Sequence, residues 1–333
     1  MRILIVKLSS LGDVVHTLPV VHDILAARPG ALIDWVVEPG FAPLVRRVAG
    51  IHSSIECPLR RWRKAWWTLQ VRREWKAFRD AIGGDRYDAV IDFQGLTKSA
   101  VIARMAHGPS YGLANRTDGA SHEWPARWLV DHPICIEARI HALDRARVLA
   151  SRALRYELAG PPSFGLRRQP MEMTERTMVL VHGTSRDDKL WPEANWIEIA
   201  RRLSHDHWRI ALPHAGEVER ARAQRIALAG GPACEVWPAM DLDALVDRMG
   251  AAHGVIGVDS GLSHIAVALD LPPVQLYNHP TAWRTGPQPA HGHAHQVSVQ
   301  ATPTPSVEDV WSAWQQVWGQ FQATGLGTPK ATR

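Results

Sequence analysis

Short apolar runs alternate with stretches of helical periodicity along most of the chain. In the first half, the predicted strands cover 3–6, 33–37 and 89–93, and the predicted helices open at Pro19, cover 65–82, follow Gly95 and cover 141–154. Apolar strands that alternate with helices favour a parallel sheet covered by helices. We therefore expect an α/β fold in this half.

The alternation pauses and then starts again in the second half. Proline and arginine pairs between 161 and 176 are typical of a linker. The predicted strands beyond it cover 178–181, 209–212, 255–258 and 274–277, and the predicted helices cover 192–203, 218–228 and 242–249 and follow Gly261. We expect two parallel α/β domains, over 1–160 and 177–305, with ligands at the carboxyl ends of their strands and a reaction site in the cleft between them.

The last predicted helix covers 306–322. Ser306 and Asp309 have the spacing of an N-terminal capping box. One apolar stripe of this helix consists of Val310, Trp314, Val317, Trp318 and Phe321. The helix either covers a single domain or crosses back to brace both. We expect a disordered tail over 323–333.

Composition agrees with a two-domain protein. The 333 residues exceed what one hydrophobic core usually holds, and no run approaches the ~18 apolar residues of a membrane-spanning helix. The N-terminal apolar run is interrupted by Lys7 and predicts a strand rather than a signal peptide, so we expect a cytoplasmic location. Cys57, Cys135 and Cys234 lie far apart without a CxxC pair, which argues against a disulfide framework or a zinc site.

The chain is basic, with a formal charge of +5 and a pI near 9.4. This charge favours an acidic partner and leaves nucleic acid, a phosphorylated substrate and an anionic membrane surface open. Several of the 15 tryptophans lie beside cations in the run RRWRKAWW from Arg60. Such a run suits the boundary between water and lipid headgroups, although a charge run is also common on a solvated helix face. No RRM, KH or helix-turn-helix signature supports a nucleic-acid partner.

A polar loop with one acid follows the first predicted strand. Gly12 permits close approach of the backbone. Asp13 lies at the start of the next helix, where the helix dipole keeps a carboxylate ionised. Asp13 either caps this helix or acts as a general base that accepts the proton of an attacking hydroxyl.

A second polar run, HGTSRDDKLWP, follows the strand that ends before His182. Thr184, Ser185 and Lys189 offer hydroxyls and an ammonium, which are the groups that stabilise a leaving diphosphate. A solvated loop is the alternative. The two acids that directly precede Lys189 predict an ion-paired turn rather than a metal site.

A third run, DSGLSH from Asp259, links a strand to a helix. The backbone N–H groups at Ser260 and Gly261 and the positive end of the helix dipole predict an anion site. Such turns are common, and the combination with Asp13 in the other domain is more informative than either part. The chain has no GxGxxG, GxxxxGK[ST], HExxH or GxSxG motif, which argues against a dehydrogenase, a P-loop NTPase, a zinc protease and an α/β-hydrolase.

Four ordered runs resemble the bacterial lipopolysaccharide heptosyltransferases, glycosyltransferase family 9, over nearly the whole chain. They are KLSSLGDVVHTLP from Lys7, RRWRKAWW from Arg60, HGTSRDDKLWPEANW from His182 and DSGLSH from Asp259. The resemblance implies a GT-B fold of two facing Rossmann-like domains, with the C-terminal helix packing on the N-terminal one. It also implies metal-independent, inverting transfer of L-glycero-D-manno-heptose from ADP-heptose to Kdo of Kdo2-lipid A. A family member that acts later in core assembly is the alternative.

The resemblance carries the family's site residues over by position. It implies catalytic roles for Asp13, as the base, and for Lys189. The implied donor contacts are Thr184, Ser185, Lys189, Glu217 at the ribose, Met240 near the adenine, and Asp259, Ser260, Gly261 and His264. The implied acceptor contacts are Ser10, Gly12, Arg60, Arg61, Arg63, Lys64 and Gln94. No metal ligand and no cofactor are implied.

The implied partners are a nucleotide-sugar donor, an anionic lipid A-type glycolipid and the cytoplasmic face of the inner membrane, with no nucleic acid. The carboxylates of Kdo and the phosphates of lipid A suit the cations that follow Arg60, and Trp62, Trp66 and Trp67 suit the lipid boundary. The run YNHPTAW from Tyr277 departs from the Gly-Pro-Thr pattern of the family and leaves the donor contacts there open.

Overall fold

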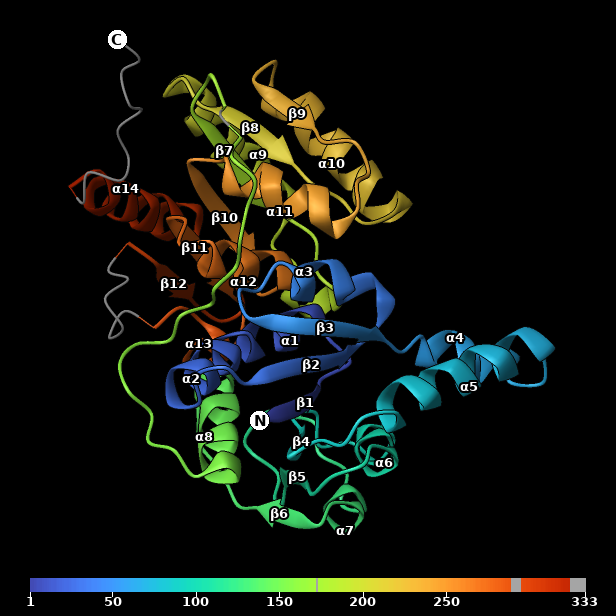
Figure 1. The fold of residues 1–333 in the computed structure, drawn as a ribbon. Helices are drawn as coiled ribbons and strands as arrows, with labels where there is room; N and C mark the ends of the chain where they lie inside the picture. The colour runs from blue at the N-terminus through green and yellow to red at the C-terminus, as the bar shows by residue number, and fades with distance from the viewer. Residues whose placement is uncertain (172, 289–294, 324–333) are drawn as a thin grey trace. The chain divides into compact units, whose positions relative to one another are not determined.

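The computed structural model describes residues 1–171, 173–288 and 295–323. The chain divides into two compact units, Met1–Arg167 and Arg168–Arg333, and each contains one parallel sheet (Figure 1). The division falls inside the stretch predicted as a linker. The predicted disordered tail lies outside the described residues except for Ala323, where the last helix ends.

The N-terminal unit has a six-stranded sheet in the order β3-β2-β1-β4-β5-β6. Its strands are β1 (Arg2–Val6), β2 (Leu32–Val37), β3 (Ile51–Glu56), β4 (Ala89–Asp92), β5 (Ser110–Leu113) and β6 (His132–Ile134). Its helices are α1 (Leu11–Thr17), α2 (Pro19–Ala27), η1 (Pro39–Phe41), α3 (Ala42–Arg46), α4 (Leu59–Ala65), α5 (Leu69–Gly83), α6 (Thr97–Met105), α7 (Ala126–Leu129) and α8 (Ala142–Leu154). The central strands β1 and β4 are buried almost throughout, as apolar strands covered on both faces are.

The C-terminal unit repeats this plan with the order β12-β11-β10-β7-β8-β9. Its strands are β7 (Thr177–Val181), β8 (Arg209–Leu212), β9 (Cys234–Val236), β10 (Gly254–Val258), β11 (Pro273–Tyr277) and β12 (Val297–Gln300). Its helices are η2 (Asp187–Lys189), α9 (Glu193–His205), α10 (Glu217–Gly230), α11 (Leu242–Gly250), α12 (Gly261–Ala268), α13 (Ala282–Thr285) and α14 (Val307–Ala323). None of the helices in the described part of the chain is both long and apolar enough to cross a membrane.

The predicted helix over 65–82 corresponds to α5, which begins at Leu69, and a separate helix that was not predicted, α4, precedes it. The chain breaks between α4 and α5 at Thr68, whose side chain accepts a hydrogen bond from the Val71 amide and so caps α5. The aromatic side chains of Trp62, Trp75 and Phe78 then hold the two helices together.

The apolar stripe of α14 is buried in the C-terminal unit. Val310, Trp314 and Val317 belong to the core formed by the second sheet, and α14 lies on β11, β12 and α9. Trp314 also packs edge-on against Trp208. The apolar side of α14 is thus covered by its own sheet.

Candidate active site

In the N-terminal unit, the chain leaves β1 and enters α1 through a loop that holds Asp13. The Ser10 hydroxyl donates to Asp13 Oδ2 at 2.8 Å, and the Ser10 amide donates to the same oxygen at 3.1 Å. Asp13 Oδ1 lies 3.8 Å from the ammonium of Lys7. Asp13 therefore helps to cap α1 from its third position, with Ser10 as the N-cap residue, and it also has a cationic neighbour.

Lys7 is buried, with only 5% of its side chain exposed, whereas the Asp13 side chain is 40% exposed. The Lys7 ammonium also donates to the Phe93 carbonyl at 3.2 Å, which fixes its position beside β4. Burial lowers the pKa of Lys7, and the charge of Asp13 opposes this shift. The pair thus consists of a hidden cation and an acid that solvent can reach.

The pKa of Asp13 is lowered from its ordinary value. Burial acts in the opposite direction, but the Lys7 charge and the hydrogen bonds from Ser10 outweigh it. Asp13 is therefore ionised at neutral pH and has the charge state that a proton acceptor requires.

Gln94 supports the same loop from the neighbouring strand. Its side-chain oxygen accepts from the Leu8 amide at 2.8 Å and from the Ser9 amide at 3.3 Å. The backbone amide of Gln94 in turn donates a hydrogen bond to the Asp92 carboxylate, whose pKa is raised by burial to about 6. Because Gln94 is buried and occupied by these amides, the structure places it as a support of the loop beneath Asp13.

The cations implied as acceptor contacts all lie on α4. Arg60, Arg61, Arg63 and Lys64 are exposed, and Arg61 forms an ion pair with Glu74 of α5. The helix follows the carboxyl end of β3, and Asp13 follows that of β1. In a parallel sheet these ends meet at one edge, so the cations and the acid lie on the same side of the N-terminal sheet.

In the C-terminal unit, two loops that the sequence singled out lie together because β7 and β10 are paired. The Lys189 ammonium donates to Asp259 Oδ2 at 2.6 Å, and the Thr184 hydroxyl donates to the Asp259 carbonyl at 3.2 Å. Gly257 permits this contact between strands, since a side chain there would meet Val181 and Ser263 at less than contact distance. The second and third polar runs thus form one cluster.

Asp259 is the centre of this cluster. Its side chain is 6% exposed, and His264 Nε2 lies 3.3 Å from its Oδ1. Burial acts to raise its pKa, but His264 and Lys189 outweigh burial and hold the pKa below its ordinary value. Asp259 is therefore a buried carboxylate held ionised by a cation and an imidazole.

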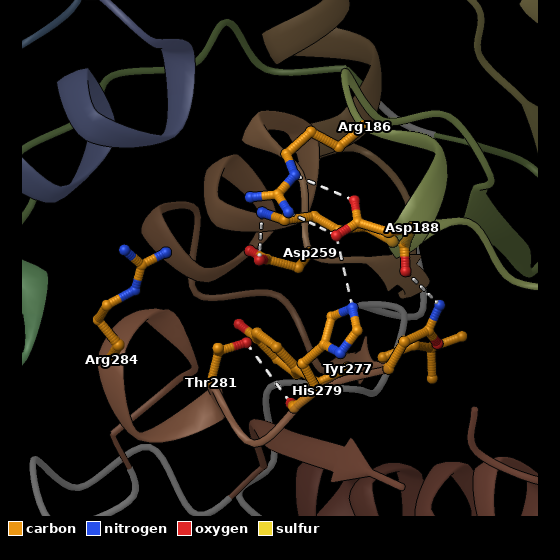
Figure 2. Close-up of a pocket in the computed structure, with 10 residues that line it drawn as sticks. Arg186, Asp188, Asp259, Tyr277, His279, Thr281 and Arg284 are labelled. Carbon is orange, nitrogen blue, oxygen red and sulfur yellow. Dashed lines mark hydrogen bonds and ion pairs between the residues drawn. The ribbon is translucent and has the colours of Figure 1, made fainter. Parts of the chain in front are cut away.

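A cavity of about 290 Å³ opens beside Lys189 and Asp259. Its polar lining also includes Arg186, Asp188, Asn278, His279, Thr281 and Arg284. Figure 2 shows the Asp188 carboxylate between the Arg186 guanidinium and the His279 ring. Three cationic side chains at one cavity suit a ligand with several negative charges, such as a diphosphate.

Several of these lining residues were not found by sequence reasoning. Arg186 belongs to the second polar run but was not assigned a role, while His279 and Arg284 arrive from the segment after β11. Asn278, in the run that departs from the family pattern, donates to the carbonyls of Asp188 and Leu190 at 3.0 and 2.9 Å. Asn278 therefore links the segment after β11 to the loop that carries Asp188 and Leu190.

The remaining implied donor contacts lie around this cluster. Ser260 is at the N-cap position of α12, Gly261 is the first residue of that helix, and Ser185 is exposed in the loop after β7. Glu217 begins α10 with 87% of its side chain exposed, 3.6 Å from Arg220, and Met240 lies partly buried between β9 and α11.

A second acid of α10 faces inward and was missed. Glu219 accepts a hydrogen bond from the Ala215 amide at 2.7 Å, and its carboxylate covers Gly183 closely enough that a side chain there would meet it at 2.6 Å. The sequence pattern that favoured Glu217 at the start of the helix gave no reason to single out Glu219.

The turn is ion-paired, but through Arg186 and not through the lysine that follows the two acids, since Lys189 pairs with Asp259. Asp188 pairs with Arg186, and its pKa is lowered by the hydrogen bond from that guanidinium. Within the described residues, no group of three or more His, Cys, Asp or Glu side chains is arranged to hold a metal ion.

Comparisons with known proteins show the family of this chain. The model of the family described as glycosyltransferase family 9 (heptosyltransferase) matches residues 59–314. Lipopolysaccharide heptosyltransferase 1 of Escherichia coli K12 is 41% identical over 286 residues, which cover 83% of this chain and 88% of that protein. Lipopolysaccharide heptosyltransferase 2 of the same strain is 25% identical over 297 residues, covering 83% and 82%.

A solved structure is similar over nearly the whole chain. The E. coli heptosyltransferase WaaC with ADP-2-deoxy-2-fluoro heptose has a TM-score of 0.80 and 36% sequence identity, and covers 98% of this chain and 100% of that one. The expected α/β fold of the GT-B type is confirmed by this likeness.

Proposed function

Since the chain belongs to glycosyltransferase family 9, the heptosyltransferases, we infer that it transfers heptose from ADP-heptose in the assembly of the lipopolysaccharide core. The observation that carries this conclusion is the identity of 41% with a lipopolysaccharide heptosyltransferase 1 over most of both chains. The cationic cavity at Lys189 agrees with a donor that contains a diphosphate.

The acceptor that we propose is Kdo of Kdo2-lipid A. Identity to the heptosyltransferase 1 of E. coli is 41%, against 25% to its heptosyltransferase 2, which favours the earlier step over a later one. The exposed cations of α4 support an anionic acceptor, because Kdo carries a carboxylate and lipid A carries phosphates.

We propose that Asp13 is the general base. The acceptor hydroxyl attacks the anomeric carbon of the heptose from the side opposite the diphosphate, Asp13 accepts its proton, and the configuration inverts. The lowered pKa of Asp13 keeps the carboxylate ionised, so it acts chiefly as the forming bond acidifies the hydroxyl.

Lys189 is proposed to stabilise the departing ADP. Its ammonium is held 2.6 Å from Asp259, and Arg186 and Arg284 line the same cavity. A preorganised set of cations offsets the charge that develops on the leaving diphosphate. The amides at the start of α12 offer further donors to the same anion.

A transfer assay with purified protein tests the proposed reaction. We expect ADP-heptose and Kdo2-lipid A to give a product that is heavier by one heptosyl unit. An acceptor that already carries heptose is the matched alternative. Faster transfer to that acceptor than to Kdo2-lipid A would assign the enzyme to a later step.

The proposed chemistry requires no divalent cation, because lysine and arginine side chains supply positive charge at the leaving group. We expect the initial rate of transfer to be the same with EDTA as without it. The control adds Mg²⁺ in excess over EDTA. A rate that falls with EDTA and returns with Mg²⁺ would show that the metal-free mechanism is wrong.

We also propose that the enzyme works at the cytoplasmic face of the inner membrane, bound at its periphery. The acceptor is a membrane lipid, and the exposed cations of α4 suit an anionic surface.

A further inference from the structure

The helices α4 and α5 form a segment, residues 59–83, that we call the basic hairpin. Figure 1 shows it extending away from the strands of the N-terminal unit, beyond the end of β3. It holds eight of the chain's lysines and arginines and two of its acids, which gives the hairpin a formal charge of +6 where the whole chain has +5. The rest of the protein is therefore nearly neutral, and the positive charge is concentrated in one projecting element.

The cations of the hairpin are exposed on both helices. They are Arg60, Arg61, Arg63 and Lys64 on α4 and Arg72, Arg73, Lys76 and Arg79 on α5. Among the described residues, only Arg61 of this set has a carboxylate partner, Glu74. Seven cations thus remain available for an external anion.

The tip of the hairpin is apolar and exposed. Trp66 and Trp67 are 65% and 60% exposed, and Leu69, which begins α5, is 71% exposed. The tryptophans nearer the sheet behave differently, since Trp62 is 5% exposed and packs against Trp75. The hairpin therefore keeps one aromatic pair for its own cohesion and presents another to the outside.

An apolar cavity of about 280 Å³ lies behind the tip. Trp62, Trp66, Val71 and Trp75 form most of its wall, and Arg63 and Arg72 also line it. An apolar hollow beside two arginines has the chemistry of a site for a hydrocarbon chain that ends in an anionic group.

We propose that the basic hairpin is a membrane-binding element that inserts its tip into the surface of an anionic phospholipid bilayer. Trp66, Trp67 and Leu69 enter the boundary between headgroups and acyl chains, and the flanking cations bind lipid phosphates. The inference rests on the proposed peripheral location and names the element that provides it. Charge complementarity decides the partner, because two copies of a hairpin with charge +6 repel each other.

Vesicle flotation tests this proposal. The protein is mixed with vesicles of phosphatidylcholine alone or of phosphatidylcholine with phosphatidylglycerol. We expect binding at least about tenfold stronger to the vesicles with phosphatidylglycerol, weakened by salt, since each cation near an anionic surface contributes about a fivefold factor. Equal binding to both, or none to either, would overturn the proposal.

A variant of the tip and a matched tryptophan control test the role of the apolar tip. Trp66→Ser with Trp67→Ser and Leu69→Gln should lose about tenfold or more in binding to anionic vesicles, because the apolar insertion is removed. The matched control is Trp124→Ser with Trp128→Ser, which removes two tryptophans that are 61% and 62% exposed outside the hairpin, and it should bind as the unchanged protein does. A loss that is equal in both variants would contradict a specific role of the tip.

Substitutions at Arg72 and Arg73 test the role of the positive charge. Arg72→Gln with Arg73→Gln should bind anionic vesicles about tenfold or more weakly, whereas Arg72→Lys with Arg73→Lys should retain binding because the charge remains. Light scattering of the unchanged protein and of the tip variant examines self-association. A dimer that the tip variant abolishes would make this face an interface between copies instead.

Transfer assays with two acceptors distinguish membrane binding by the hairpin from the transfer reaction itself. Heptose transfer to a deacylated, water-soluble acceptor should proceed equally in the tip variant and the unchanged protein, while transfer to the acylated acceptor in vesicles falls in the variant. Absence of transfer by the unchanged protein would count against the proposed function alone. Tight binding of RNA together with no binding to anionic vesicles would identify the hairpin as a nucleic-acid site and overturn the inference.

Discussion

At the scale of single residues, the charge state of Asp13 depends on Lys7. The Lys7 ammonium is buried 3.8 Å from the carboxylate and is held there by the Phe93 carbonyl. Because the folded-state pKa of Asp13 is depressed, the ionised acid contributes to stability above its ordinary pKa, and this contribution is lost as pH falls through the folded pKa. The same interaction keeps the proposed base ionised at the lower pH values at which an ordinary Asp begins to protonate.

Replacing Lys7 by Met should move the acidic limb of the activity profile to higher pH. Without the ammonium, burial acts against only the hydrogen bonds from Ser10 and a more distant arginine, and the pKa of Asp13 rises. The measurement is kcat/KM as a function of pH for both proteins. Binding of ADP, measured by calorimetry, serves as a control for folding of the C-terminal unit. A uniform drop in activity with an unmoved acidic limb would make Lys7 a structural residue only.

At the scale of elements, α14 is fixed by a contact that involves a glycine of β10. A side chain at Gly254 would meet the Trp314 ring at 2.3 Å and Met178 at 3.0 Å. The bare backbone at this point lets the indole lie directly on the strand. The position of α14 on its own sheet thus depends on one small residue opposite one large one.

Gly254→Ala should lower the free energy of unfolding by about 1–3 kcal/mol, the usual cost of overpacking a core. Gly319→Ala is the matched control, because Gly319 lies in α14, the helix that packs on β10, and has open space around it. It should raise the free energy of unfolding by up to about 1 kcal/mol, since alanine favours helix more than glycine does. Urea denaturation compares the three proteins, and a Gly254→Ala protein as stable as the unchanged one would show that α14 is loosely packed.

The break between α4 and α5 shows that side-chain contacts set where helices begin and end. The pattern over 65–82 predicts one helix, whereas the cap by Thr68 starts α5 at Leu69 and the packing of Trp62 on Trp75 holds the unpredicted α4 beside it. Edge strands such as β3, with the polar sequence IHSSIE, escaped prediction for a related reason. Their pairing with a neighbour stabilises them more than their own pattern does.

At the scale of the whole molecule, the two proposed chemical roles fall to different units. Asp13 belongs to the N-terminal unit, and every residue that lines the cavity at Lys189 belongs to the C-terminal one. A donor site in one unit and a base in the other, as proposed, predict separable effects of substitution on binding and on turnover.

Asp13→Ala should lower kcat by about 10²–10⁴-fold, the usual contribution of a general base, and leave the affinity for ADP-heptose unchanged. Lys189→Ala should weaken ADP binding by about tenfold or more, because a charge-assisted contact to the diphosphate is lost. Calorimetry with ADP and steady-state kinetics measure the two effects. If Asp13→Ala turned over at the rate of the unchanged enzyme, its assignment as the base would be wrong.

The sequence by itself determined the tandem α/β plan and placed Asp13, Lys189 and Asp259 at the ends of strands. This was possible because apolar periodicity and the polar residues after each strand are local properties of the chain. Four ordered motifs also identified the family. Their order along the chain is independent of how the chain folds.

Only the tertiary structure decided which groups meet. The pairing of β7 with β10 brings Lys189 to Asp259, and the segment after β11 adds Arg284 to the same cavity. It also decided that α14 covers its own sheet and that Trp62 is buried while Trp66 is exposed. These outcomes depend on strand order and on competition for buried surface between residues far apart in the chain, which no local pattern contains.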